Sequence, residues 1–300
     1  MMSRRVLLTG ATGLIGRQAI NPLKAHGFTV VAMTRGREAV AQADETVVAD
    51  LLDGDAMKAA VHSVRASHLV HLAWHNDVSD RWDSPKNIDW ANATLQLARS
   101  FSDAGGRCAV IAGSCAEYDW QRPGPYRESD PLGPSTPYGK AKAATGRLLS
   151  KAAEDMGIRL AWARIFFCYG PGEPPGRLAG DLIRGLSAGK TVDCTDGRQE
   201  RDFLHAADIG RALAILADRD ANGAVNIASG CAIPVLTLIE TVVRLMERPG
   251  LVRLGVLPRP VNDPPRIEAD VTRLTTEFGF EPEFDLESGI TNVIALDRRG

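Results

Sequence analysis

The chain has 300 residues and a formal net charge of -2, with 44% hydrophobic and 24% charged residues. This balance excludes a disordered or fibrous protein. It also lacks the strong positive charge typical of proteins that bind nucleic acid or anionic membranes, so we expect neither as a partner. At roughly 100–200 residues per domain, the length predicts one large domain, or a large domain and a small one.

The cysteines bear on the compartment and on metal binding. There are five of them, an odd number, widely spaced and without a C-x-x-C pair. This pattern argues against a disulfide framework and a zinc cluster, and we predict no metal. The first strand begins too early to leave room for a secretory segment, and no apolar stretch reaches the ~20 residues of a membrane span. We therefore expect a cytoplasmic protein.

Short β-rich runs alternate with helical stretches through the first half of the chain. The apolar residues of these runs follow one another without alternation, which is typical of parallel strands covered by helices on both faces. This alternation of strands and helices predicts a doubly wound α/β fold with a parallel sheet. The predicted strands are residues 6–8, 28–33, 46–49, 67–72, 108–112 and 160–165.

The pattern changes after residue 167. Residues 169–176 are rich in glycine and proline and predict a turn-rich loop, and short irregular elements follow it. We predict a first domain over residues 1–167. Residues 168–300 are expected to form mainly a smaller α/β substrate-binding lobe, with segments that return to the core of the first domain.

A glycine-rich turn separates the first predicted strand from a helix that we expect to reach about residue 26. Without side chains at this turn, a phosphate can approach free amides at the positive end of the helix. The spacing G-x-x-G-x-x-G differs from the G-x-G-x-x-G fingerprint, but the strand–turn–helix context matches it. A plain tight turn is the alternative. We predict that the first domain binds a dinucleotide through Gly10, Thr12, Gly13, Leu14, Ile15 and Gly16.

The end of the second predicted strand distinguishes NADP from NAD. An acid there would bind the adenosine ribose of NAD, but this chain has Thr34, followed by Arg35 and Arg37. A guanidinium pairs well with the 2′-phosphate of NADP, which favours NADP over NAD. Alternatively, Arg35 is solvated or stacks on the adenine of either cofactor. Asp50 and Leu51 are predicted to meet the adenine, with a plain surface position as the alternative for Asp50.

Tyr138 and Lys142 are four residues apart on a predicted helix and share one face. A nearby ammonium, together with the positive nicotinamide ring, favours the phenolate, so we expect the pKa of Tyr138 to fall below its usual value near 10. Such a tyrosine can exchange a proton with an alcohol or sugar oxygen. Alone, the pair could be an exposed helix pair. Ser114, however, follows the fifth strand at the carboxyl edge of the sheet, where it can hold the same oxygen.

These motifs together resemble the extended short-chain dehydrogenase/reductase family, in its nucleotide-sugar epimerase/dehydratase branch. The resemblance implies a Rossmann-type domain, an NAD(P)-linked redox step at a sugar carbon, and often a homodimer formed through the helices that flank the sheet. It also implies that Ser114 and Tyr138 bind the reacting oxygen, with Tyr138 as acid/base, and that Lys142 holds the nicotinamide ribose. Further matching segments are residues 9–16, 50–51, 71–74, Asn87, 113–114, 169–171, 201–203, 225–227 and 269–271, of which Leu72, Ala73 and Trp74 are candidate cofactor contacts.

The chain departs from this family at positions that matter for the reaction. Dehydratases of the family have an Asp-Glu pair after the Ser/Thr position, where this chain has Cys115 and Ala116, so we do not expect dehydration. Glu117, one position later, is a candidate substrate contact, with a salt bridge as the alternative. Phe167 stands where the family often has an asparagine that contacts the nucleotide-sugar phosphates. The pose of the diphosphate, and the presence of a nucleotide, therefore stay open.

Three arginines are candidates for binding the substrate. Arg201 matches the arginine of the family's R-D-F segment, which resembles a clamp on the substrate phosphates. Arg177 and Arg259 lie on predicted loops and are weaker candidates. The alternative for all three is solvation at the surface. The loop over residues 75–90 is expected to cover the nicotinamide and the sugar.

The sequence favours an NADP-dependent ketoreductase that acts on a keto nucleotide sugar, most simply a 4-keto sugar, with Tyr138 as the proton donor. The main alternative is an NAD-dependent nucleotide-sugar epimerase that works through a transient ketone, and Arg35 is modest evidence against it. A non-enzymatic NADP-binding sensor is a distant third possibility, because such relatives tend to lose the Tyr–Lys pair that this chain keeps.

Overall fold

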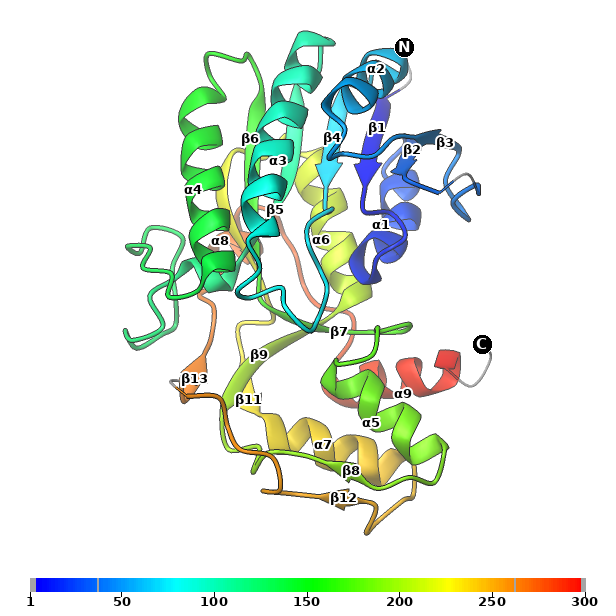
Figure 1. Cartoon of the computed structure of the whole chain (residues 1–300), viewed down its shortest axis with the longest axis vertical. Coiled ribbons are helices and arrows are strands. Elements are labelled where there is room, and N and C mark those ends of the chain that lie inside the picture. Colours follow the sequence, from blue (N-terminus) through cyan, green and yellow to red (C-terminus); the bar gives the residue numbers. More distant parts are fainter. Residues whose placement is uncertain (1–3, 37, 262, 298–300) are drawn as a thin grey trace.

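The computed structural model describes residues 4–36, 38–261 and 263–297, so Arg37 lies outside the described residues. Within them, a seven-stranded parallel sheet forms the larger part of the molecule, in the order β10-β6-β5-β4-β1-β2-β3 (Figure 1). The predicted doubly wound α/β fold is confirmed. The strands are β1 (Arg4–Thr9), β2 (Phe28–Thr34), β3 (Glu45–Val48), β4 (His68–His71), β5 (Cys108–Ser114), β6 (Arg159–Ile165) and β10 (Gly223–Ile227).

Helices cover both faces of this sheet, which explains the continuous apolar runs. In β1, Val6 and Leu8 face one core and Leu7 faces the other. Because successive side chains of a strand point to opposite faces, a strand covered on both sides must be apolar throughout. The first core includes α1 (Leu14–Ala25) and α6 (Ala206–Asp218), and the second includes α2 (Gly54–Val64), α3 (Lys86–Asp103) and α4 (Pro137–Ala152).

A smaller lobe lies below the carboxyl ends of the parallel strands (Figure 1). Its helices α5 (Leu178–Ser187), α7 (Val235–Leu245) and α9 (Leu286–Asp297) share one apolar core. Its short strands form two small sheets. One contains β7 (Phe167–Tyr169), β9 (Glu200–His205), β11 (Ala232–Pro234) and β13 (Arg266–Ile267), and the other pairs β8 (Val192–Asp193) with β12 (Val252–Arg253).

Some segments beyond residue 167 belong to the large sheet. Strand β10 pairs in parallel with β6, from Gly223 beside Ala161 to Ile227 beside Ile165, and α8 (Thr272–Thr276) packs on β10. All six predicted strands are present. Strand β10 is not among them, because Gly223 and Asn226 interrupt its apolar pattern. None of the described helices combines the length and apolar character that a membrane crossing needs.

Candidate active site

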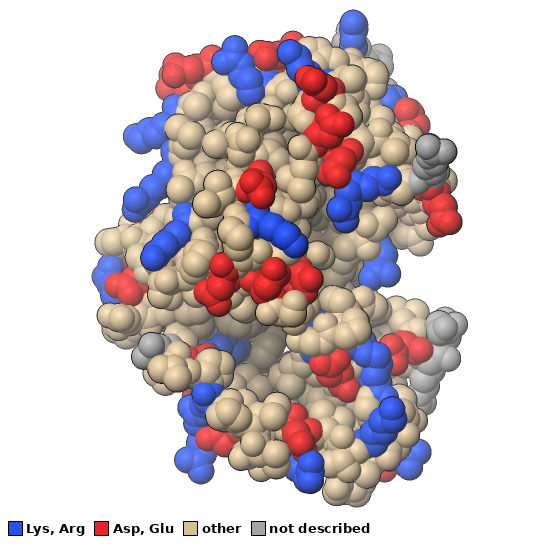
Figure 2. Space-filling view, in the orientation of Figure 1, with Lys and Arg blue, Asp and Glu red and all other residues tan. Residues whose placement is uncertain are grey.

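A cavity of about 830 Å³ opens at the carboxyl ends of β1, β2, β4, β5 and β6. Figure 2 shows the molecule hollowed between its larger part and the lobe. Ligands of open α/β sheets bind at this edge. The cavity brings together most of the predicted site residues: Gly10, Thr12, Gly13, Ile15, Thr34, Arg35, Asp50, Leu51, Leu72, Ala73, Trp74, Ser114, Tyr138, Lys142, Phe167 and Arg177.

The glycine turn provides a cradle for phosphate. Gly10 has a φ of +71°, and a Cβ there would stand 2.8 Å from the backbone nitrogen of Ala73. Gly16 packs against Gly10 in the same way, and neither Gly16 nor Leu14 is among the residues that line the cavity. A Cβ on Gly13 would meet only the carbonyl oxygen of Gly10, at 3.2 Å, so the open space beside Gly13 belongs to the cavity. Gly13 also begins α1 without a side-chain cap, which leaves helix amides free for an anion. The turn therefore fits the phosphates of a dinucleotide.

The end of β2 forms the far side of the cavity. Here the Thr34 hydroxyl accepts a hydrogen bond from the amide of Gly36 at 3.2 Å, and the Asp50 carboxylate accepts one from the amide of Leu52 at 3.0 Å. Arg35 is exposed, and it forms no ion pair with another residue of the described chain. A guanidinium in this position is available to a ligand.

Tyr138 lies near the start of α4, next to the end of β5. Its side chain is hydrogen-bonded to Ser114, and its backbone amide donates to the carbonyl oxygen of Trp82 at 3.0 Å. The rings of Trp82 and Trp74 contact Tyr138 edge-on, with centroids 5.3 and 6.4 Å away. Burial raises the pKa of Tyr138 to about 12 against the opposing effect of the Ser114 hydrogen bond.

Lys142 lies one helical turn further along α4 and is buried. Its Nζ donates to the carbonyl oxygen of Ala112 at 2.8 Å and lies 3.6 Å from the ring centroid of Trp74. Burial lowers the pKa of Lys142 to about 7. In the protein without cofactor, the cost of burying a phenolate dominates and Tyr138 keeps its proton at neutral pH. The fall expected with the nicotinamide ring bound stays a prediction.

Glu117 lies beneath the cavity rather than in it. Its carboxylate is 1% exposed, accepts the amide of Ser114 at 2.7 Å and Nε1 of Trp162 at 2.9 Å, and pairs with Arg164 at 3.1 Å. The predicted substrate contact is corrected to the alternative, a salt bridge. The hydrogen bond from its amide fixes the backbone of Ser114, so Glu117 positions the serine.

Two of the predicted substrate arginines are already paired with carboxylates. Arg201 is buried, forms an ion pair with Asp263 and donates to the carbonyl oxygen of Pro264 at 2.9 Å. Arg259 makes two hydrogen bonds of 2.6 Å to Asp196. Neither lines the cavity, so the structure does not bring them to the predicted site. Both carboxylates come from loops about 60 residues away in sequence.

Part of the loop that was expected to cover the nicotinamide and the sugar does line the cavity, including Trp82 and Trp90. Arg81 of this loop was not singled out, and Cys168 was missed, because neither belongs to a motif. The available signal was Asn87, a residue of the family resemblance. Buried Asn87 donates to the carbonyl oxygens of Arg81 at 2.8 Å and Ser84 at 2.9 Å, and accepts from Nε1 of Trp74 at 2.8 Å.

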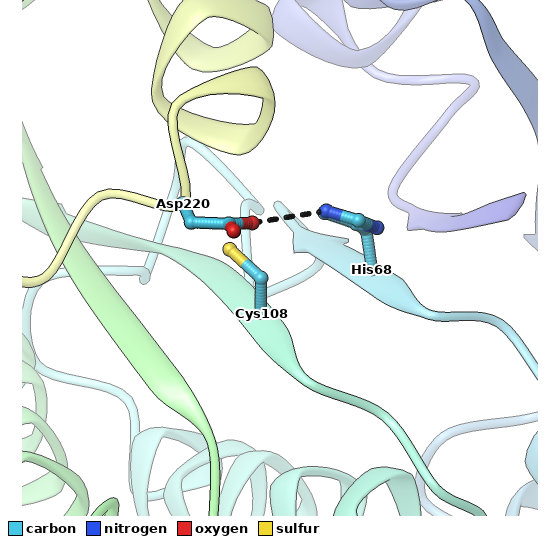
Figure 3. Close-up of side chains that lie close together, drawn as sticks. All are labelled: His68, Cys108 and Asp220. Carbon is cyan, nitrogen blue, oxygen red and sulfur yellow. Dashed lines mark hydrogen bonds and ion pairs between the residues drawn. The ribbon is translucent and has the colours of Figure 1, made fainter. Parts of the chain in front are cut away.

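His68, Cys108 and Asp220 gather at the opposite edge of the sheet, where β4 and β5 begin (Figure 3). Their potential ligand atoms lie within 4.8 Å of one another. The histidine and the carboxylate already have protein partners. His68 lies 3.2 Å from Asp220 and 2.8 Å from the Ser67 hydroxyl. Asp220 also forms an ion pair with Arg159 at 3.5 Å. We therefore assign this group to the hydrogen bonding of the sheet edge and not to a ligand.

The fold, the glycine cradle and the grouped Ser114, Tyr138 and Lys142 define a dinucleotide-dependent enzyme of the Rossmann type. Residues 6–228 match the model of the NAD dependent epimerase/dehydratase family, and the chain belongs to this family. The resemblance to extended short-chain dehydrogenases/reductases is thus confirmed.

Proteins that are similar to this chain have more than one activity. The chain is 27% identical over 316 residues to the UDP-glucose 4-epimerase of Azospirillum brasilense, covering 96% of this chain and 90% of that protein. It is 28% identical over 302 residues to the dTDP-4-dehydro-6-deoxy-D-allose reductase of Streptomyces bikiniensis, covering 93% and 92%. It is also similar to MoeE5 in complex with UDP-glucose and NAD, with a TM-score of 0.85, 29% identity and coverage of 98% and 99%.

Proposed function

We propose that this protein is an NADP-dependent ketoreductase whose substrate is a keto nucleotide sugar, most simply a 4-keto sugar. The observation that carries the proposal is the grouping of Ser114, Tyr138 and Lys142 in one cavity, with the guanidinium of Arg35, unpaired among the described residues, on its far side. Ser114 and Tyr138 can hold the oxygen of a ketone, and Tyr138 can donate a proton to it. An epimerase would use the same tyrosine to remove and to return a proton, so Arg35 is what favours the reductase.

The side chains have distinct parts in this reaction. When bound, the reduced nicotinamide supplies the hydride. Ser114 and Tyr138 hold the carbonyl oxygen of the substrate, and Tyr138 donates its proton as negative charge develops there. The Ser114 Oγ accepts the amide of Ala116 at 3.2 Å, which fixes its position beside Tyr138. Lys142 is proposed to hold the nicotinamide ribose from the same face of α4.

The positions after Ser114 do not provide an acid/base pair for the elimination of water. Cys115 and Ala116 occupy the corresponding positions and are 5% and 3% exposed. The nearby Glu117 is held by Ser114, Trp162 and Arg164 and does not line the cavity. These observations support a simple reduction over a dehydration.

The proposed choice of NADP rests on Arg35. Its guanidinium lines the cavity beyond Thr34, where the chain has no acid to bind an unmodified adenosine ribose. A phosphate on that ribose would form charge-assisted hydrogen bonds with it.

The second candidate is an NAD-dependent nucleotide-sugar epimerase, which the similarity to a UDP-glucose 4-epimerase favours. Such an enzyme keeps its cofactor and consumes none. A cofactor-binding sensor is disfavoured, because Tyr138 and Lys142 remain together on one face of α4 beside Ser114.

We also propose that the protein is a cytoplasmic homodimer. Helices α3 and α4 pack side by side on one face of the sheet. They carry Ile88 and Leu148, which are 72% and 54% exposed. Apolar side chains on neighbouring helices favour contact with a second copy. The described cysteines are all free, which suits a reducing compartment.

The test is an assay of NADPH and NADH consumption with a small panel of 4-keto-6-deoxy nucleotide sugars. Consumption of NADPH in proportion to product supports the ketoreductase. No consumption, together with a nicotinamide cofactor released when the protein is denatured, would favour the epimerase.

A further inference from the structure

Lys142 is a buried cation without a carboxylate partner. Its side chain belongs to a residue that is 3% exposed, and it forms no ion pair with any other residue of the described chain. An ammonium has three N–H donors, and the acceptor beside this one is the carbonyl oxygen of Ala112, at 2.8 Å. The buried Arg164, by contrast, is paired with Glu117 at 3.1 Å. Because burying an ammonium with so few partners is costly, we looked for another group that stabilises it.

The indole ring of Trp74 covers this ammonium. Trp74 follows β4 and Ala112 lies in β5, and these parallel strands are neighbours, so both residues reach Lys142 from the same edge of the sheet. The Lys142 Nζ lies 3.6 Å from the centroid of the ring. A cation within about 6 Å of such a centroid is attracted to the negative face of the ring, most strongly for tryptophan and where water is excluded. Trp74 is itself only 9% exposed, so the contact is buried on both sides.

The ring of Trp74 is held in a fixed orientation. Its Nε1 donates to the Oδ1 of Asn87 at 2.8 Å, and the side-chain amide of Asn87 donates to the carbonyl oxygens of Arg81 and Ser84 at 2.8 and 2.9 Å. A side chain locked by such hydrogen bonds can hold a neighbouring group in place. The ring of Tyr138 meets Trp74 at 87°, with the centroids 6.4 Å apart. Trp74 therefore contacts both the tyrosine and the lysine of the site.

The other charged and titratable groups near Lys142 do not replace this contact. Glu117 attracts the ammonium from beneath the cavity, but its carboxylate is paired with Arg164. Burial holds the pKa of His71, at the end of β4, at about 3 and that of Tyr138 at about 12, so both are neutral at pH 7. Further titratable groups of the cavity lining are His75, Arg81, Lys86 and Cys115. A probe of Lys142 itself separates its titration from theirs.

We propose that Trp74 is a positioning residue for Lys142, whose ring holds the ammonium beside Tyr138 and favours its charged form. This inference rests on the proposed function, in which Lys142 holds the nicotinamide ribose. Burial lowers the pKa of Lys142, and the ring acts against that fall because its negative face attracts only the protonated form. A charged Lys142 is also the stronger hydrogen-bond donor to a ribose hydroxyl.

NMR of the full chain without cofactor, labelled with ¹³C at the Cε of lysine, follows the titration of Lys142 directly. The signal of Lys142 is the one that is missing from Lys142→Met. We expect Trp74→Leu to move the midpoint of this titration to lower pH by about one pH unit, because a cation–π contact is lost at a buried site. Trp74→Phe keeps a weaker ring face and should restore part of the difference.

Replacing tryptophan with 5-fluorotryptophan keeps the size of the ring and weakens its negative face. It should move the Lys142 midpoint to lower pH by about 0.3 pH unit, and it should have no effect in Trp74→Phe, where the remaining tryptophans are still fluorinated. The control substitution is Trp120→Leu. Trp120 is half-buried, its indole donates to the carbonyl oxygen of Cys115 at 3.0 Å, and it does not line the cavity. This variant should keep the wild-type midpoint.

Two results would overturn the inference. One is a midpoint that neither Trp74→Leu nor fluorination changes. The other is a midpoint that rises, which would mean that the ring only shields the ammonium from water. The fluorinated protein decides if Trp74→Leu does not fold or if the two measurements disagree, since fluorination leaves the access of water unchanged.

These measurements need neither a substrate nor turnover. If the midpoint falls as expected but no keto sugar is reduced, Trp74 keeps its part in positioning Lys142 and the proposed reaction is rejected. If a keto sugar is reduced and the midpoint does not fall, the ketoreductase stands and the inference about Trp74 is rejected.

Discussion

The hydroxyl of Tyr138 is the proposed proton donor, and a side chain without that oxygen could not donate a proton. The hydroxyl is hydrogen-bonded to Ser114 and holds its proton with a pKa of about 12. We predict that Tyr138→Phe lowers kcat of the reduction by about 10²–10⁴-fold, the usual contribution of a general acid. Cofactor affinity should change little. Single-turnover kinetics and a cofactor titration measure the two effects.

The matched control is Tyr126→Phe. Tyr126 is buried, and its hydroxyl donates to the carbonyl oxygen of Arg122, away from the cavity lining. It should keep its reduction rate. Full activity of Tyr138→Phe would show that another group supplies the proton.

Arg35 is the residue on which the proposed selection of NADP depends. It is exposed at the end of the cavity and forms no ion pair with another described residue, so its guanidinium is available to a 2′-phosphate. We predict that Arg35→Gln weakens NADPH binding by about tenfold or more, because a charge-assisted pair is lost. NADH binding should change less than twofold. Equal losses for both cofactors, measured by fluorescence titration, would remove the basis for choosing NADP.

At the scale of the elements, α3 and α4 form the face proposed to meet a second copy. Leu148 is 54% exposed on α4. We predict that Leu148→Lys shifts the protein from dimer to monomer in light scattering after gel filtration, because a charge would be buried at the interface. Leu296→Lys, which alters a leucine that is 42% exposed on α9, should leave the dimer intact. A wild-type monomer would contradict the proposed assembly.

The regular elements were the predictable part of this chain. Strands such as β5 and β6 are apolar on both faces, and the pattern alone indicates a covered parallel sheet. The glycine turn, Ser114, Tyr138 and Lys142 were also found, because each lies at a fixed place relative to such a strand or helix. Arg81 was not singled out, although its loop was expected to cover the site, because no motif marks the arginine itself; the amide of Asn87 holds its backbone.

The predictions that failed concern charged residues whose ion-pair partners lie far away in the sequence. Glu117 meets Arg164 across 47 positions, and Arg201 meets Asp263 across 62. Nothing local in the sequence indicates which charges a fold will bring together. The high pKa of Tyr138 without cofactor could not be foreseen for a related reason, because the spacing to Lys142 is visible in the sequence but the depth of burial is not.

At the scale of the whole molecule, the buried Lys142 links stability to pH. Burial lowers its pKa from 10.5 to about 7. Between these values the unfolded chain binds a proton at Lys142 that the folded chain does not. The contribution of Lys142 to the free energy of unfolding therefore rises with pH, by at most about 1.4 kcal/mol per pH unit.

We accordingly predict that Lys142→Met is more stable than the wild type at pH 7 and that this advantage shrinks towards pH 9. Urea denaturation of both proteins without cofactor, at several pH values, measures the difference. An advantage that stays constant from pH 7 to pH 9 would mean that Lys142 keeps its proton in the folded protein.

The cavity joins two parts of the chain that are far apart in sequence. Gly13 and Arg35 come from the first βα units, and Phe167 and Arg177 come from the segment that leads into the lobe. The cofactor end depends on local motifs, whereas the substrate end is built from loops. The reaction class is therefore easier to infer than the substrate, and the central claim is the direction of hydride transfer.

That claim is tested most directly by a single turnover with NADPH deuterated at the transferring position of the nicotinamide. A 4-keto-6-deoxy nucleotide sugar serves as substrate, and mass spectrometry follows the label. The proposed ketoreductase predicts one deuterium per product molecule, on the carbon that gains the hydroxyl, with an equal amount of NADP⁺ formed. Absence of deuterium from the keto sugar, together with epimerisation of a 4-hydroxy nucleotide sugar such as UDP-glucose without net consumption of cofactor, would contradict the reductase and identify an epimerase.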